Sequence, residues 1–514
     1  MKLTTKQEKL FPYNKSSLLK IICILTLFSV LTGILSGCND TIVATEAETY
    51  IDKGNMSQTA TVTLNLGYSA SDSLNPYFMS TDLNSDLTSL IFESLFFIDD
   101  TFNADKGLAV SHSLSGNSLT VKLDTSAAFS DGVQFSSTDV VYSFNIAKIS
   151  SLYKNNLKYV ESAKSAGNDT VIFTLSGYYN SAQNSLTFPI VKNGSADNSS
   201  SIPVGTGLYA ISPNGEAVTL TYNPYCRKPQ PNISKINLQV LDSESTLVHT
   251  LELGKIDAYF DDLSSGNYSQ ANAKTTKTNM TNLVFLGMNS NSYGLSNSNV
   301  RKAVYYSLNR QSIVSNAFKN FAVESYTPYH PDWYVFTSSD YDSSALALDY
   351  SKAQNLMKSA GFNDTLNYTL IVYAGNNFKI AAAKEIQKNL ANIGINLTIS
   401  ELTWENYKLA LAEGNYNFYI GEIKLPDNMD MSALFSNSKA VYGVSASDTT
   451  NTAFSEFAAG NISVNALTDS FLQNMPFAPV CFRSGVLIYS NDINSTADCN
   501  YGNIYKNIYE WNKQ

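Results

Sequence analysis

FSDGVQFSSTDVVYSF, residues 129–144, combines a tight turn with the start of a helix in one short segment. Asp131-Gly132 is a turn pair, because glycine tolerates the positive φ that many turns between strands require. Ser137 is a suitable N-cap for the helix, whose apolar face consists of Val140, Val141, Phe144 and Ala147. Short alternating strands flank this segment, at 119–123 and 171–175. The pattern predicts an α+β region over about residues 97–200.

Patterns typical of α/β structure lie on both sides of this region. Before it, apolar residues alternate over 61–68 as in a strand, and five more then recur at helical spacing: Leu83, Leu87, Leu90, Ile91 and Leu95. After it, the apolar run 283–288 predicts a strand covered on both faces. Residues 300–308 predict a helix with Asn299 or Ser298 as its cap. Another helix, over 380–393, ends at Gly394 before a strand.

Seven motifs in this order resemble the family 5 solute-binding proteins of ABC importers, a group that includes oligopeptide-, dipeptide- and nickel-binding proteins. FSDGVQFSSTDVVYSF is similar to a signature of that family, and PVGTGLY (203–209) is similar to its PVGTGPY turn, with Leu208 where proline is usual. The remaining motifs are SDSLNPYF with LTSLIFESLFFID near the start, LELGKIDAYF (251–260), VRKAVYYSLNRQSIV (300–314), AQNLMKSAGF (353–362) and IQKNLANIGINL (386–397). Together they extend from about residue 62 to about residue 480.

The resemblance implies an α/β, periplasmic-binding-protein-like fold of type II, cluster C, with two α/β lobes, a hinge and an α+β domain inserted in the first lobe. The expected divisions are a signal peptide (1–37), a linker (38–58), lobe I (59–96 and 201–285), the inserted domain (97–200), lobe II (286–470) and a return to lobe I (471–514). The hinge is expected at 286–289 and about 477–482. Such a receptor closes on its solute and delivers it to a membrane permease.

The N-terminus predicts export and lipidation. Five lysines precede a mostly apolar stretch over 21–35, and Leu35-Ser36-Gly37-Cys38 then looks like a bacterial lipobox. An uncleaved membrane helix is the alternative, but the apolar stretch is short for one. A diacylglycerol on Cys38 would anchor the protein by two acyl chains. We therefore expect a lipoprotein on the outer face of the cell membrane, in a bacterium that is expected to be Gram-positive.

Charge and length exclude several classes of protein. The formal charge is −10, and removal of residues 1–37, which carry a net +4, leaves −14. Such a chain repels phosphate backbones, so nucleic acid is not an expected partner. The 477 remaining residues (514 minus 37) suggest two or three domains, and we expect a monomer.

Cysteine and histidine give little sign of a metal centre. Cys226, Cys481 and Cys499 form no CxxC motif; Cys481 and Cys499 either pair as a disulfide or remain buried thiols. The histidines His112, His249 and His330 lack the spacing of zinc ligands. We therefore expect neither a metal nor another cofactor.

The segment from Tyr416 to Asp430 bears on the solute. Peptide-binding members of the family follow a Tyr-Asp strand with a tryptophan and then an aspartate that pairs with the α-ammonium of the peptide. Lys424 falls about where that aspartate belongs, and Glu422 lies two residues earlier, on the same side of an extended strand. One hypothesis is that Glu422 and Lys424 present a charge pair to the cleft, suited to a zwitterionic ligand. The alternative is a solvated or internally paired couple.

Four further residues are secondary candidates for lining the cleft. Trp404 follows a strand of the second lobe, with core packing as its other role. Asn75 and Tyr77 lie in the first-lobe loop. Arg483 has the charge to meet a carboxylate, or else forms an ion pair at the surface.

Rival functions find less support. A hydrolase of the serine or zinc type lacks both a GxSxG elbow and an HExxH motif, although a pair of carboxylates brought together by folding stays open. A surface adhesin has no reason to carry the family motifs. Within the family, the solute is expected to be peptide-like; a metal chelate, a sugar or an amino-acid derivative is the alternative, as is a sensor in place of a transporter.

Overall fold

The structure is a computed structural model that describes residues 62–514, except 178, 215–216, 338–342, 436–443 and 445–446. The predicted signal peptide (1–37), Cys38 and the predicted linker (38–58) lie outside the described residues. Within the described part of the chain, none of the helices has the length and apolar composition that a membrane span needs.

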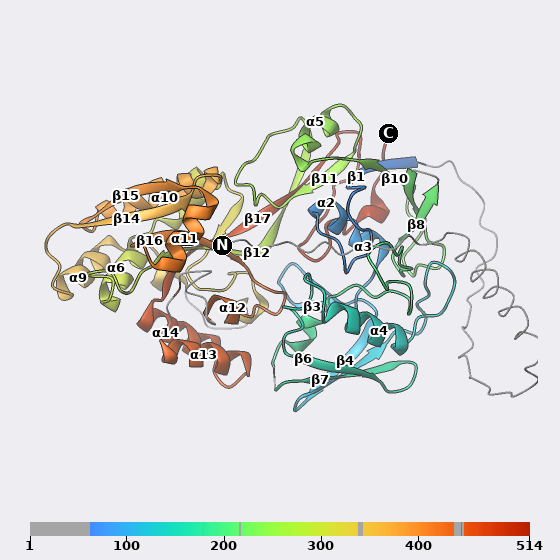
Figure 1. The fold of residues 1–514 in the computed structure, drawn as a ribbon, viewed down its shortest axis with the longest axis horizontal. Helices are drawn as coiled ribbons and strands as arrows, with labels where there is room; N and C mark the ends of the chain where they lie inside the picture. The colour runs from blue at the N-terminus through green and yellow to red at the C-terminus, as the bar shows by residue number, and fades with distance from the viewer. Residues whose placement is uncertain (1–61, 178, 215–216, 338–342, 436–443, 445–446) are drawn as a thin grey trace, which may run out of the picture. The chain divides into compact units, whose positions relative to one another are not determined.

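An 11-stranded mixed sheet is the main element of the fold (Figure 1). We call the part around β1 and β8–β11 the first lobe and the part around β14–β16 the second lobe. β13 (Ala322–Glu324) pairs separately with β17. The other strands are, in spatial order, β15 (Ile395–Leu402), β14 (Leu366–Tyr373), β16 (Phe418–Lys424), β12 (Lys274–Met288), β17 (Phe477–Tyr489), β11 (Ala258–Asp261), β1 (Val62–Tyr68), β10 (Ile233–Val240), β9 (Ala217–Tyr222) and β8 (Tyr209–Asn214).

The long antiparallel strands β12 and β17 connect the two lobes. All 13 residues of β17 are buried, as are the last nine of β12, which include the apolar run 283–288. The two strands pair from Lys274–Tyr489 to Gly287–Phe477. Pro479, which has no N–H to donate, lies where their register shifts, as expected for proline inside a sheet. The predicted hinge segments therefore belong to the two strands that the lobes share.

A second, four-stranded antiparallel sheet lies within residues 97–200. Its order is β4 (Ala109–Ser115), β5 (Ser118–Leu123), β7 (Thr170–Leu175) and β6 (Val160–Ser165). Helix α4 (Ser137–Ala147) packs on β6 and β7. The predicted turn is confirmed, since Gly132 has φ +87°. Two short strands, β2 (Phe96–Ile98) and β3 (Ala104–Lys106), form a separate pair.

The prediction that Ser137 caps α4 is wrong by one residue. Ser136 is the N-cap, in extended backbone conformation, and its backbone N–H donates to the Asp139 carboxylate (2.9 Å). Ser137 is the first residue of the helix, and its hydroxyl donates to the Gly167 carbonyl (2.7 Å).

The helical spacing after β1 predicts more helix than the structure contains. Two four-residue helices, α2 (Asp82–Ser85) and α3 (Thr88–Ile91), replace it. The Ile91 carbonyl accepts from the Gly207 N–H (2.9 Å), and Phe92 is already extended. A side chain at Gly205 would lie 2.1 Å from the same carbonyl. A tertiary contact with the PVGTGLY turn therefore ends the helix.

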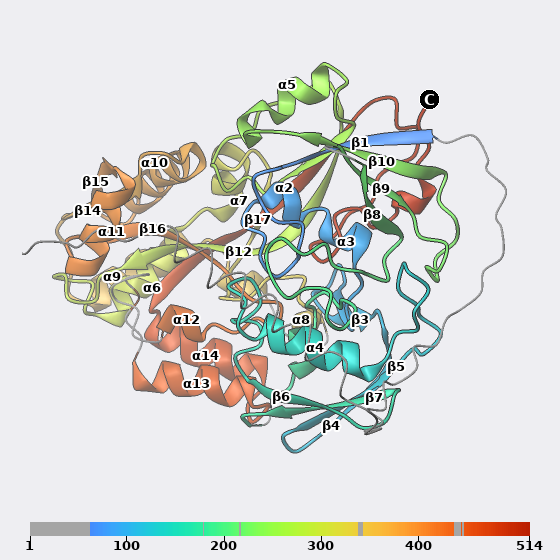
Figure 2. The ribbon, with the colours of Figure 1, turned by 45° about the vertical axis from the view of Figure 1, so that its right-hand side comes forward.

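The remaining first-lobe helices are short, whereas the second lobe has several longer ones (Figure 2). Helix α6 is capped by Asn297, whose side chain accepts from the Asn299 N–H (2.9 Å), so the predicted caps Ser298 and Asn299 are wrong. Helix α10 packs on β14 and β15, and α6 packs on β17. Besides α2 and α3, the helices of the described residues outside 97–200 are η2 (Glu244–Thr246), α5 (Leu247–Glu252), α6 (Ser298–Ser307), α7 (Arg310–Ser312), η3 (Ile313–Ala317), α8 (Tyr334–Thr337), η4 (Ser343–Leu346), α9 (Tyr350–Ser359), α10 (Asn377–Ala391), α11 (Trp404–Glu413), α12 (Ser432–Phe435), α13 (Asp448–Ala458), α14 (Val464–Asn474) and η6 (Ile508–Glu510).

The C-terminal segment packs on the first lobe. Trp511 is fully buried and stacks on Tyr489 of β17, with ring centroids 6.0 Å apart. Lys513 Nζ lies 2.8 Å from Asp257 Oδ2, just before β11. These contacts agree with a return of the chain to the first lobe after β17.

The three described cysteines, Cys226, Cys481 and Cys499, are buried free thiols. Cys481 belongs to the core cluster of the second lobe and the hinge, whereas Cys499 belongs to the cluster of the first lobe and residues 97–200. The alternative of a Cys481–Cys499 disulfide is therefore wrong.

Candidate functional site

A cavity of about 490 Å³ opens between loops of the first lobe and the end of β16 in the second lobe. It is markedly acidic, because five carboxylates and one ammonium group line it. These charged residues are Asp82, Asp86, Glu244, Asp261, Asp262 and Lys424.

The strand topology brings the five acids together. β1 is parallel to both β10 and β11, so the three strands end at the same edge of the sheet. Asp82 and Asp86 follow β1, Glu244 follows β10, and Asp261 and Asp262 end or follow β11. The carboxyl ends of parallel strands are where α/β sheets usually place their ligands. The sequence does place acids after each of these strands, but none of the five is among the site residues predicted from the sequence.

Burial and repulsion between neighbouring acids make Asp82, Asp86, Glu244 and Asp261 harder to ionise. Burial, followed by the negative charge of Asp262, raises the pKa of Asp82. Burial and the neighbouring acids raise the pKa of Glu244 and Asp261 likewise, and that of Asp86 by a large amount. The cavity therefore brings together carboxyl groups that repel one another when they are ionised.

Glu422 lies next to this cavity in a network of ion pairs. Its carboxylate accepts from Arg483 Nε (2.9 Å) and Asn282 Nδ2 (3.0 Å), and Lys379 Nζ lies 2.8 Å from its other oxygen. Burial alone would raise the pKa of Glu422, but the charges of Lys379 and Arg483 and their hydrogen bonds lower it to about 2. Glu422 is therefore a buried carboxylate that stays ionised, and its partners are Lys379, Arg483 and Asn282 of the protein itself.

Lys424 has different surroundings from Glu422, although both lie on β16. Its ammonium lies 5.6 Å from the centre of the Tyr501 ring, and it lines the acidic cavity. Tyr501 is the main cause that raises the pKa of Lys424; Asp262, Asp427 and Asp82 add to this effect against an opposing effect of burial. Of the two residues in the hypothesised charge pair, only Lys424 lines the cavity.

Arg483 lies in β17 with 2% of its surface exposed. Besides the bond to Glu422, its Nη2 lies 3.7 Å from Asp262 Oδ2. Neither Nη atom has a hydrogen-bond partner within the described residues. Arg483 is therefore a buried cation between the Glu422 network and the acidic cavity.

Asn75 and Tyr77 hold a first-lobe loop in place and do not line this cavity. The Asn75 amide is fully buried and donates to the carbonyls of Ala196 (3.2 Å) and Asn198 (2.9 Å). Tyr77 is 2% exposed, and its hydroxyl donates to the Pro189 carbonyl. Their polar groups bind this loop to residues 189–198.

Trp404 lies neither in the core nor in the lining of the acidic cavity. It is the first residue of α11, and half of its surface is exposed. Its ring stacks on Tyr407, with centroids 5.8 Å apart, and meets the edge of Tyr373 at 5.5 Å. Its contacts in this structure are thus with neighbouring rings of the second lobe.

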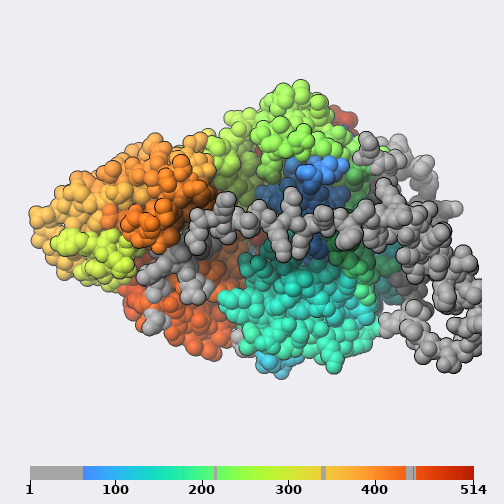
Figure 3. All heavy atoms as spheres, in the orientation of Figure 1, coloured from blue at the N-terminus to red at the C-terminus, as the bar shows by residue number. Residues whose placement is uncertain are grey.

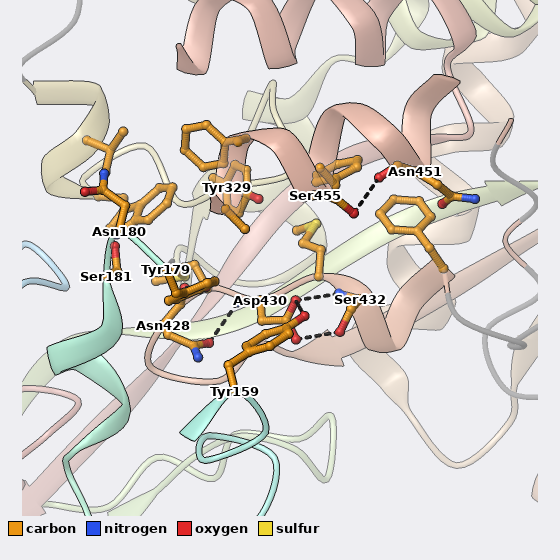
Figure 4. Close-up of a pocket in the computed structure, with 18 residues that line it drawn as sticks. Tyr159, Tyr179, Asn180, Ser181, Tyr329, Asn428, Asp430, Ser432, Asn451 and Ser455 are labelled. Carbon is orange, nitrogen blue, oxygen red and sulfur yellow. Dashed lines mark hydrogen bonds between the residues drawn. The ribbon is translucent and has the colours of Figure 1, made fainter. Parts of the chain in front are cut away.

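A second cavity, of about 230 Å³, has seven aromatic residues among the 18 that line it (Figure 4). Tyr159 and Tyr179 stack on its side formed by residues 97–200, with ring centroids 5.2 Å apart. Tyr329, Trp333 and residues of α13 line it from the second lobe. Asp430 brings a carboxylate to this cavity, where it accepts from the Ser432 N–H (3.0 Å).

The segment after β16 joins the second lobe to residues 97–200. In the space-filling view, orange-red atoms of the second lobe lie beside the teal atoms of residues 97–200 (Figure 3). The Tyr179 hydroxyl donates to the Asn428 carbonyl (2.8 Å). Asp427 Oδ2 accepts from Asn156 Nδ2 (2.9 Å) and from the Thr187 hydroxyl (2.5 Å). Asp427 lies within the segment from Tyr416 to Asp430 but is not among the site residues predicted from the sequence.

None of the three histidines lines either cavity. His330 is fully buried between the rings of Phe102 and Phe482, and burial lowers its pKa to about 3. In the part of the chain that the structure describes, no three His, Cys, Asp or Glu side chains are grouped so as to hold a metal ion.

Comparison of sequences identifies the family of this chain. Residues 104–443 match the family described as bacterial extracellular solute-binding proteins, family 5 Middle. The oligopeptide-binding protein AppA of Bacillus subtilis is 23% identical over 381 residues, which cover 67% of this chain and 69% of AppA.

Solved structures of similar proteins share the fold. The substrate-binding protein CtaP of Listeria monocytogenes superposes with a TM-score of 0.70 at 19% identity, covering 88% of this chain and 100% of CtaP. NikA of Brucella suis, solved with Fe(III)-EDTA, gives a TM-score of 0.64 at 14% identity over 88% of this chain and 100% of NikA. AppA of Bacillus subtilis, solved with a nonapeptide, gives 0.58 at 18% identity over 88% and 99%.

These likenesses confirm the predicted mixed α/β fold of cluster C of the periplasmic-binding proteins. The family match covers more than half of the chain. The protein therefore belongs to family 5 of the bacterial extracellular solute-binding proteins, receptors of ABC importers that bind solutes and do not transform them.

Proposed function

We propose that this protein captures a peptide-like solute between its two lobes and delivers it to an ABC permease at the membrane. The observation that carries the proposal is the cavity of about 490 Å³ whose lining combines first-lobe loops with Lys424 of the second lobe. A solute that contacts both sides stabilises the closed arrangement of the lobes, because it gains both sets of contacts only there. Shared strands such as β12 and β17 are suited to act as the hinge.

The lipobox supports the location that this function needs. A diacylglycerol on Cys38, followed by the linker of residues 39–58, would hold the receptor on the outer face of the membrane beside its permease. Labelled fatty acid should enter the wild-type protein and not the Cys38→Ser variant, which should leave the membrane fraction. A Cys38→Ser variant that stays membrane-bound would contradict the anchor.

Two observations favour a peptide-like solute: the charged residues that line the cavity, and the peptide bound to a protein of similar fold. AppA was solved with a nonapeptide, and peptides present ammonium and carboxylate groups that charged side chains recognise. Lys424 is suited to an anionic group of the solute. Glu422 acts as a positioning residue, because it holds Arg483 and Lys379 beside the cavity.

Mass spectrometry of the small molecules released from purified protein tests this function directly. Peptides should dominate the released material, and adding the identified peptide should reduce the radius of gyration in small-angle scattering as the lobes close. Release of a metal chelate, a sugar or an amino-acid derivative would overturn the peptide assignment while keeping the transport class. Loss of Lys424 should weaken binding of peptides with a free carboxyl terminus more than that of their amides.

A further inference from the structure

We propose that the acidic cavity binds a positively charged group, so that the preferred solutes are cationic peptides; this rests on the proposed function. The geometry is the first argument. Five carboxylates from three separate segments face one cavity, and Lys424 is the one basic residue among those that line it. Because the acids outnumber the single lysine, this lining attracts a cation and repels an anion of similar size.

A buried hydroxyl group without a hydrogen-bond partner points to a ligand independently of the acids. Tyr259 lines the cavity and is 5% exposed, yet its hydroxyl has no hydrogen-bond partner within the described residues. Burial raises the pKa of Tyr259, and the negative charge of Asp261 raises it further. The Tyr259 hydroxyl therefore lies close enough to the Asp261 carboxylate to feel its charge. A buried hydroxyl without a partner is costly, and a bound ammonium would satisfy its oxygen.

The electrostatics of the carboxylates support the same conclusion. Burial is the first cause that raises the pKa of Asp86, Glu244 and Asp261, and the negative charges of Asp82 and Asp262 raise it further. Lys424 offsets only part of this charge. A guanidinium or ammonium group that enters the cavity relieves the repulsion and forms charge-assisted hydrogen bonds, and the two effects act in the same direction.

Asp82 and Asp262 are the most informative residues to change. An Asp262→Asn variant keeps an oxygen that can accept from the Ser264 N–H, which Asp262 Oδ1 now does at 2.7 Å. An Asp82→Asn change likewise removes charge with little change in shape. The double variant removes like-charge repulsion but also the ion pair between Asp262 and Arg483, so its thermal unfolding is measured beside its binding to show that it is folded. Asp364→Asn removes one exposed charge outside the cavity and is the matched control.

Calorimetric titration with tri-lysine, tri-alanine, tri-glutamate and spermidine tests the inference at low and at moderate salt. Tri-lysine should bind about tenfold tighter than tri-alanine, and tri-glutamate should not bind. The Asp82→Asn/Asp262→Asn variant should lose about tenfold in affinity for tri-lysine and most of its salt dependence, with tri-alanine unchanged. Lys424→Gln should strengthen the binding of spermidine, which has no carboxylate for Lys424 to pair with, and Asp364→Asn should match the wild type.

The outcomes separate this inference from the proposed function. Equal affinity for tri-lysine and tri-alanine overturns the cationic preference and leaves peptide binding intact. Binding of spermidine but of no peptide, with loss in the double variant, overturns the peptide assignment and supports the cationic site. Absence of binding by both tri-lysine and spermidine, or an unchanged tri-lysine affinity in the double variant, overturns the inference.

Discussion

Arg483 Nε donates a 2.9 Å hydrogen bond to Glu422 Oε1, and this bond joins β17 to β16 across the intervening strand β12. β12 takes part as well, since Asn282 donates to the same carboxylate oxygen. A single acid thus ties together side chains of the two long strands that the lobes share and of the strand that carries Lys424 into the cavity. The network fixes the direction in which β16 approaches the first lobe.

Loss of Glu422 should be costly in stability. Glu422→Gln leaves Arg483, which is 2% exposed, without its carboxylate, and should lower the free energy of unfolding by about 3 kcal/mol. Denaturant titration of Glu422→Gln, Arg483→Met and the double variant should give a coupling energy of about 1 to 3 kcal/mol. Glu405→Gln, at an exposed helix ion pair with Lys408, is the control and should cost less than about 0.5 kcal/mol. Additive effects of the two changes would contradict a shared network.

The lowered pKa of Glu422 makes the free energy of unfolding depend on pH. The folded-state pKa of Glu422 is about 2, below its ordinary value of 4.5, so the anion stabilises the folded state above pH 4.5. This contribution, about 3 kcal/mol, is lost as the pH falls from 4.5 toward 2. The difference in unfolding free energy between wild type and Glu422→Gln should shrink over that pH range. The contributions of the other acids cancel in this difference, because both proteins contain them. A difference that stays constant down to pH 2 would mean that the pKa is not lowered.

Local patterns predicted the regular elements well, because burial repeats along each one. The alternation over 61–68 and the apolar run 283–288 became β1 and part of β12, and the spacing over 380–393 became α10. Caps were less certain, because several polar residues adjoin each helix start. The backbone selects among them: Ser136 is extended, with φ −147°, whereas Ser137 is already helical. The helix expected after β1 is interrupted by a contact with Gly207, 116 positions beyond Ile91, which no local pattern contains.

The candidate site was harder to predict, because it is assembled from distant segments. Glu422 and Lys424 share one side of β16, yet one faces Lys379 and Arg483 and the other faces Tyr501 and the acidic cavity. Asn75 and Tyr77 belong to a motif that resembles the family, but their side chains serve the loop itself. The acids of the cavity follow three different strands, so only the parallel pairing of β1 with β10 and β11 reveals that they meet.

The cysteines should behave as inaccessible thiols. Burial raises the pKa of Cys226, Cys481 and Cys499, so both access and thiolate formation are disfavoured in the folded state. In a chain that begins at Asn39, maleimide should label none of them under native conditions and all three after denaturation without reductant. Labelling of a single thiol after denaturation would show that two are paired. A Cys226→Ser variant, with two labelled thiols, is the control.

Asp427 should control how firmly the second lobe holds residues 97–200. Its carboxylate accepts from Asn156 Nδ2 (2.9 Å) and the Thr187 hydroxyl, and Asn156 in turn accepts from the Asp427 N–H (3.0 Å). Asp427→Ala removes these side-chain bonds and should cost about 2 kcal/mol, which shifts the population toward arrangements without this contact. Small-angle scattering should then report a larger radius of gyration, and solute affinity should fall. Asp427→Asn keeps one acceptor oxygen and should lie between wild type and Asp427→Ala, while Asn156→Ala should reproduce the alanine variant. Identical scattering from all four proteins would mean that these bonds do not hold the two parts together.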